Sequence, residues 1–216
     1  TSVIGNHYAG PFEECASLNN VTFGEGITNI PVQLFYGCTG ITKITIPDTI
    51  KTIGNRAFQG CSNLTEIEIP SNVQSIGESA FLSCSKLEKV TLNEGLVSIG
   101  EYSFKNTKIT SVYIPATLTS VIGNHYAGPF EECASLTDVT FSKKPAIIPR
   151  YLFEGCTGLK EITIPSTIVR LDDKAFEDCS ALEKITILNG YAKINDNEST
   201  IAPKAVIHGY NDSSAH

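Results

Sequence analysis

The amino-acid sequence predicts a β-rich solenoid, a single curved and right-handed array of about eight short coils. Three observations predict it: a 23-residue unit that starts again as soon as it ends, a Phe that recurs at nearly constant steps, and an apolar pattern too short to close a core alone. The clearest unit runs from Cys61 to Ser83, and Cys84 begins the next one. Coils of this kind bury their apolar side chains by stacking on their neighbours.

The recurring Phe sets the register of the coils. Successive members are separated by 23, 23, 23, 23, 26, 23 and 23 residues, and all but Phe104 are followed three positions later by Cys, with Thr107 in the missing place. The members are Phe12, Phe35, Phe58, Phe81, Phe104, Phe130, Phe153 and Phe176. A fixed period of this size with L-x-x-L-x-L spacing is typical of leucine-rich-repeat solenoids.

Each unit predicts four elements in order. Alternate apolar residues such as Ile67 and Ile69 predict a short strand. Pro70 ends that strand because it has no N–H to donate. The pair Val73 and Ile76 predicts a second short strand on the opposite wall, followed by a glycine turn. The A-F-x-x-C segment is then expected to return the chain as a helical turn or a piece of 3-10 helix.

A longer repeat of 118 residues overlies the short one. Residues 1–18 are identical to residues 119–136, and in both copies Asn-His-Tyr-Ala-Gly-Pro adds three residues to the turn before Phe. We therefore expect one solenoid over residues 1–188, made of a super-repeat over 1–118 and a partial one over 119–188. Turn-rich residues 189–216 are expected to form a C-terminal cap and tail.

Composition excludes several classes of protein. The formal net charge of −7 argues against binding to nucleic acid or to an anionic membrane surface, which need clustered Lys and Arg. No apolar run approaches the roughly 20 residues that cross a bilayer, so no membrane insertion is expected. The sequence lacks Met and opens inside a repeat, so we expect that any targeting segment has been removed.

The unit C-S-x-L-x-x-I-x-I-P-x-x-V-x-x-I-G-x-x-A-F resembles the BspA-like leucine-rich repeat of bacterial and protozoal surface proteins. This resemblance covers residues 1–188, and the ending from Val206 to Ala215 is similar to the segment that closes many such arrays. The resemblance implies an extracellular or cell-surface module with adhesive function. It supplies no catalytic residues to transfer.

The solvent-facing position of each main strand is the first candidate binding surface, because it lines the concave face of such arrays. The residues that we expect to contact a ligand there are Thr45, Glu68, Thr91, Tyr113, Thr140 and Thr163. Tyr113 is the lone aromatic of the row, flanked by Glu68 and Glu88, and is the best candidate for a contact hot spot. A plain solvated strand face rich in Thr is the alternative interpretation.

The two three-residue insertions are the second candidate surface. They place His7, Tyr8, His125 and Tyr126 on protruding loops that could supply polar and aromatic contacts. The alternative is a surface insertion that one gene duplication copied without selection for binding.

The seven Cys residues occupy one column and do not follow any metal-ligand spacing. We interpret them as a buried column of small side chains, against the alternatives of a disulfide or a metal site. No metal, cofactor or catalytic residue is predicted, because no His stands beside a candidate nucleophile in a recognised pattern.

Together these features predict a non-catalytic recognition or adhesion module, cell-surface or secreted. Its expected partner is a protein or glycan ligand, such as host matrix or another cell surface. Two alternatives stay open: a structural stalk that spaces another domain from the surface, and a carbohydrate-active enzyme.

Overall fold

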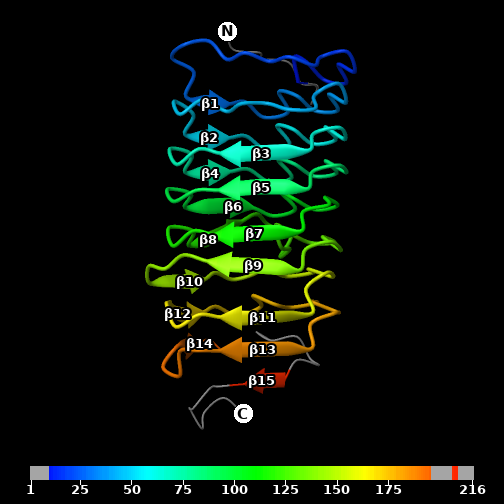
Figure 1. The fold of residues 1–216 in the computed structure, drawn as a ribbon. Helices are drawn as coiled ribbons and strands as arrows, with labels where there is room; N and C mark the ends of the chain where they lie inside the picture. Colours follow the sequence, from blue (N-terminus) through cyan, green and yellow to red (C-terminus); the bar gives the residue numbers. More distant parts are fainter. Residues whose placement is uncertain (1–9, 196–205, 209–216) are drawn as a thin grey trace.

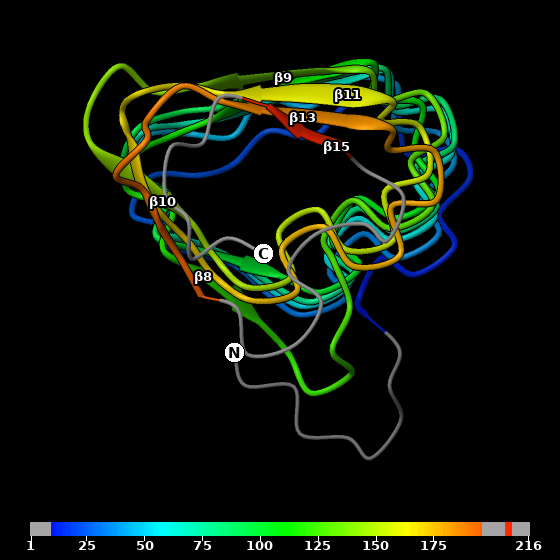
Figure 2. The ribbon, with the colours of Figure 1, turned by 90° about the horizontal axis from the view of Figure 1, so that it is seen from below.

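The computed structural model describes residues 10–195 and 206–208, which form about seven turns of a parallel β-solenoid with 23-residue spacing (Figure 1). Viewed along the stack, each coil has three walls (Figure 2). The main wall consists of β3 (Glu66–Ile69), β5 (Lys89–Leu92), β7 (Ser111–Ile114), β9 (Asp138–Phe141), β11 (Glu161–Ile164), β13 (Lys184–Ile187) and β15 (Val206–His208). The second wall consists of β1 (Asn29–Ile30), β2 (Thr52–Ile53), β4 (Ser75–Ile76), β6 (Ser98–Gly100), β8 (Ser120–Ile122), β10 (Ala146–Ile148), β12 (Ile168–Leu171) and β14 (Lys193–Ile194).

Strands within a wall pair in parallel with the next coil. The register follows the repeat, so that Ile67 pairs with Val90 and Ile53 pairs with Ile76. Both walls are interrupted at the same level: the hydrogen-bonded order β3-β5-β7-β9 is separate from β11-β13-β15, and β1-β2-β4-β6-β8 is separate from β10-β12-β14. The coil just before this level contains the three-residue insertion.

The third wall, which we call the turn wall, carries the Phe and Cys columns. The helical or 3-10 segment expected there is absent from the described residues, and a series of turns takes its place. Arg56 has a φ of 57° and Ser79 a φ of 56°, so left-handed residues interrupt the right-handed ones. Alternate N–H groups therefore point along the stack, as when Phe58 N donates to Ala80 O at 2.8 Å. A helix would satisfy those groups within its own coil.

The core is a set of stacked side-chain columns between the walls. The rings of Phe58 and Phe81 stack at 5.1 Å between centroids, as do those of Phe81 and Phe104, and all three are fully buried. All seven Cys are free, and six of them are buried. The thiol of Cys84 donates to Phe58 O at 3.1 Å, a contact that recurs in several coils. The interpretation of the Cys residues as a structural column is confirmed.

The C-terminal segment continues both walls. Within the segment expected to form the cap and tail, the structure has the strand β15, which pairs with β13. Residues 196–205 and 209–216 lie outside the described residues, so the division into solenoid and cap stays a prediction. The part of the chain that the structure describes contains no helix long and apolar enough to span a membrane.

Candidate functional site

The main wall places the predicted ligand-binding column on one outer face. Along β3, Ile67 and Ile69 point into the core while Glu68 lies exposed between them, as the period of two in a strand requires. Parallel pairing in register then aligns Glu68 with Thr91 and Tyr113 with Thr140. Thr45 and Thr163 take the same position in their own coils, but the interruption between β9 and β11 divides the column.

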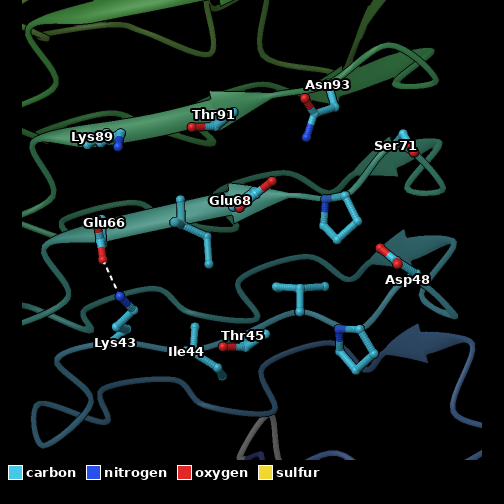
Figure 3. A pocket seen from close by; sticks show the side chains of 14 residues that line it. Lys43, Ile44, Thr45, Asp48, Glu66, Glu68, Ser71, Lys89, Thr91 and Asn93 are labelled. Carbon is cyan, nitrogen blue, oxygen red and sulfur yellow. Dashed lines mark ion pairs between the residues drawn. The ribbon is translucent and has the colours of Figure 1, made fainter.

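A shallow hollow of about 630 Å³ lies on this face over three coils (Figure 3). It includes three of the predicted residues, Thr45, Glu68 and Thr91, and leaves out the other three. Its polar rim and floor come from adjacent coils, so the hollow exists only when the coils are stacked. The further polar residues that line it are Lys43, Asp48, Glu66, Ser71, Lys89 and Asn93.

The two ends of the hollow differ in charge. At one end Lys43 Nζ lies 2.6 Å from Glu66 Oε1, and this hydrogen bond lowers the pKa of Glu66 (Figure 3). Glu68 lies in the middle of the hollow, and Asp48, Ser71 and Asn93 lie toward the other end (Figure 3). Within the described residues, the side chains of Glu68 and Asp48 have no hydrogen bond or ion pair.

Tyr113 lies outside this hollow and its hydroxyl is already engaged. It donates to Glu94 Oε1 at 2.8 Å, and Ser142 Oγ donates to the same oxygen at 2.7 Å. Burial alone would raise the pKa of Glu94, but the bonds from Ser142 and Tyr113 outweigh it and hold the pKa below its usual value. The carboxylate that binds the Tyr113 hydroxyl is therefore Glu94, and not Glu68 or Glu88, which the sequence analysis placed beside Tyr113. No signal in the sequence links residues 94, 113 and 142.

The insertion near residue 125, which we call the bulge (residues 123–128), projects on the side away from the main wall (Figure 2). His125 and Tyr126 are exposed on it, and Tyr126 has 68% of its surface accessible. The buried carboxylate of Glu101 accepts hydrogen bonds from the backbone N–H groups of His125 at 2.7 Å and Tyr126 at 2.8 Å. A side chain at Gly123 would overlap that carboxylate, which explains the glycine there. The bulge is thus held in one shape from below.

A second carboxylate holds the other end of the bulge. Glu154 Oε2 accepts from Gly128 N at 2.6 Å. Burial raises the pKa of Glu154 to about 7, the bond from Gly128 opposes that rise, and the nearby Glu131, Asp178 and Glu177 add to it. Sequence reasoning found neither Glu101 nor Glu154, because both belong to neighbouring coils.

Aromatic side chains of the neighbouring coils surround the bulge. The ring of His125 lies 6.0 Å from that of Tyr102, and the ring of Tyr126 lies 5.9 Å from that of Tyr151. His125 Nε2 also lies 3.6 Å from Glu78 Oε1. The predicted counterparts His7 and Tyr8 lie outside the described residues. The structure therefore places the two candidate surfaces on different walls and does not join them into one site.

A metal centre has no support in the described residues, where no group of three or more His, Cys, Asp or Glu side chains could hold an ion. Burial also raises the pKa of the Cys61 thiol to about 12 and of the Cys156 thiol to about 12, so these thiols stay protonated and are poor ligands and nucleophiles.

The family model described as the BspA type leucine rich repeat region matches residues 6–129 and 123–198, in six copies. The chain belongs to the BspA-type leucine-rich repeat family. The resemblance read from the 23-residue unit is confirmed, and the family model indicates no enzyme family. No curated protein matches the chain.

Solved structures of bacterial leucine-rich repeat proteins share the fold. The chain is 31% identical to a leucine-rich repeat protein from Bacteroides ovatus, with a TM-score of 0.58, over 77% of this chain and 45% of that one. It is 24% identical to the T. pallidum leucine rich repeat protein (TM-score 0.53, 78% and 73% covered). It is 19% identical to the pneumococcal vaccine antigen PcpA (TM-score 0.53, 81% and 44% covered). This BspA-type chain thus spans less than half the length of the Bacteroides ovatus protein.

Proposed function

We propose that this BspA-type array is a non-catalytic recognition module, cell-surface or secreted, that adheres to a protein or glycan through the main-wall face and the bulge. The hollow on the main wall is the observation that carries the proposal. It offers hydroxyl, amide and carboxylate groups from three coils, including Thr45, Glu68 and Thr91, on a surface that is already formed.

Rigidity supports this function. Except at the interruption, neighbouring coils are joined by backbone hydrogen bonds on all three walls, and the strands of the face hold their side chains at fixed spacing. A ligand that docks on such a surface orders few protein groups, so that modest contacts are enough for useful affinity. The bulge supports a second contact, because Glu101 fixes a loop that exposes His125 and Tyr126.

An array of matrix glycoproteins, cell-surface proteins and glycans, probed with the whole chain, tests the proposal. We expect a saturable signal that falls at least about tenfold in Thr45→Tyr and Thr91→Tyr, because a ring fills the hollow while β propensity is kept. Thr52→Tyr, at an exposed strand position on the second wall, is the matched control. Tyr126→Ala and His125→Ala measure the contribution of the bulge.

The stalk is the second candidate function, favoured by the unbroken stack of Phe rings from Phe12 to Phe176. The same array separates the two. Silence of the folded chain across the array would contradict recognition and favour a spacer. A signal that every variant retains would mean that neither surface is the contact.

A further inference from the structure

The charges in the hollow are not balanced along its length. Lys43 and Glu66 neutralise each other in an ion pair at one end. Glu68 in the middle of the hollow and Asp48 at its other end have no cationic partner among the described residues, and both are exposed. Lys89 lies on the same side as the ion pair, where its charge helps to lower the pKa of Glu66 (Figure 3). One end of the hollow is therefore acidic and the other is neutral to basic.

The acidic end also carries apolar surface. Both prolines line the hollow: Pro47, which directly precedes Asp48, is half-buried and supplies most of this surface, while Pro70, directly before Ser71, is buried. An alkyl stem that ends in a cation suits such a place, because the stem covers apolar surface while the charged group reaches the carboxylates. A guanidinium suits it best, since its planar fork of donors can bond a carboxylate through two parallel hydrogen bonds.

We propose that the hollow binds an extended protein segment through one basic side chain, Arg or Lys, whose cationic group meets the carboxylates of Glu68 and Asp48. This inference rests on the proposed function and names the class of partner for its main-wall contact. Lys89 sets the orientation, because it repels the cation from the opposite end. The hydroxyls of Thr45 and Thr91 remain to bond the backbone of the segment, and so does Oδ1 of Asn93, whose Nδ2 donates to Ile69 O at 3.0 Å.

A neutral glycan fits these features less well. No aromatic ring lines the hollow, so a sugar ring finds no stacking surface there. Neutral hydroxyl groups would also leave two carboxylates without a counter-charge. A basic side chain does both: its cation neutralises the carboxylates, and its alkyl stem covers the proline surface beside them.

Titration of the whole chain with two capped peptides tests the inference, one with a single Arg between Gly and Ser residues and one with citrulline at that place. Citrulline keeps the shape and loses the charge. We expect binding of the Arg peptide in the high-micromolar to millimolar range, about three- to tenfold tighter than the citrulline peptide. We expect this preference to shrink between about 50 and 300 mM salt.

Substitutions locate the contact. Glu68→Gln and Asp48→Asn are each expected to remove most of the preference for Arg over citrulline. Lys89→Gln is expected to strengthen binding of the Arg peptide by about twofold. Glu183→Gln removes one exposed carboxylate, without an ion pair among the described residues, from the main-wall side beyond the interruption and is the matched control, expected to change nothing. All these side chains lie on the surface, and unchanged melting temperatures will show that the variants fold.

The outcomes separate this inference from the function on which it rests. Equal affinity for both peptides, or a preference that Glu68→Gln and Asp48→Asn both leave intact, would overturn the basic-segment inference. If array binding is then still lost in Thr45→Tyr and Thr91→Tyr, recognition through the hollow stands with a partner of another class. If neither peptide nor array gives a signal, both proposals fail.

Discussion

Glu154 shows how one side chain joins the bulge to the coil that follows it. Its carboxylate bonds Gly128 N, yet it is half-buried and stacked near Glu131 and Glu177 of the adjoining coils. The pKa of Glu154 near 7 in the folded chain, against an ordinary value of 4.5, means that the folded protein holds this proton more tightly than the unfolded chain. Protonation of Glu154 therefore contributes to the free energy of unfolding at low pH. This contribution grows as the pH falls from about 7 to about 4.5, and it is lost as the pH rises through 7.

Glu154→Gln is expected to abolish this pH dependence. At pH 8 the variant should melt higher by roughly 2–4 °C, because it removes a desolvated charge and keeps an oxygen that accepts from Gly128 N. At pH 5 the melting temperatures of variant and parent should converge. Thermal unfolding at both pH values measures this, with Glu183→Gln, an exposed carboxylate on the main-wall side, as control. A variant that is less stable than its parent at pH 8 would contradict the assigned burial.

At the scale of one element, the turn wall has two left-handed positions in each coil. One of them, two residues after the Phe, holds glycine in Gly37, Gly60 and Gly155, but Ser83 takes it with a φ of 60° and Asp178 with a φ of 55°. The backbone of this position is therefore fixed by the stack and not by the residue type. Left-handed conformations are less costly for glycine than for residues with a Cβ.

Ser83→Gly is expected to stabilise the array by about 0.5–1 kcal/mol, the relief of left-handed strain less the extra chain entropy of glycine. Gly60→Ala, the reverse change one coil earlier, should destabilise it by about 0.5–1 kcal/mol, because the same two terms act with opposite sign. Denaturant unfolding measures both. Ser85→Gly, which is exposed and has no positive φ, is the control and should be neutral or destabilising. Equal effects of Ser83→Gly and Ser85→Gly would contradict the turn geometry.

At the scale of the whole molecule, the interruption of both walls divides the stack. Between β9 and β11, and between β8 and β10, no ladder of backbone bonds is formed. Here the stacked Phe rings are also furthest apart, with 6.2 Å between Phe130 and Phe153 against 5.1 Å between Phe58 and Phe81. Stability of a solenoid is close to a sum of nearest-neighbour terms, so this interface is the weakest link of the described coils.

Phe153→Ala is expected to split unfolding into two steps, with the coils after the interruption unfolding first. The cavity should cost about 3–5 kcal/mol, enough to uncouple a stack that is already weak there. Phe81→Ala removes the same ring where both ladders are continuous, and we expect it to lower stability without a second step. Native-state hydrogen exchange, compared between residues 66–92 and 161–187, measures this. Equal protection in both segments of Phe153→Ala would contradict the weak interface.

The candidate sites were predictable only in part. The column Thr45, Glu68, Thr91 follows from the strand period, because alternate residues of a strand face the same side. That these three border a hollow while Tyr113 is tied to Glu94 does not follow, because it depends on side-chain reach between coils. The same holds for the bulge: the insertion was visible, and its support by Glu101 was not.

The sequence alone determined the family, the 23-residue coil, the inward columns of Phe, Cys and Leu, and the alternation of the main strands. The 23-residue unit recurs about eight times along the chain. Its residue spacing alone therefore indicates these features, without knowledge of contacts between distant residues. Tertiary structure alone decided that the turn wall is not helical, where the walls are interrupted, and which carboxylates are engaged. Backbone N–H groups and side chains there find their partners one coil away, and the choice between a local and a neighbouring partner is made only when the coils stack.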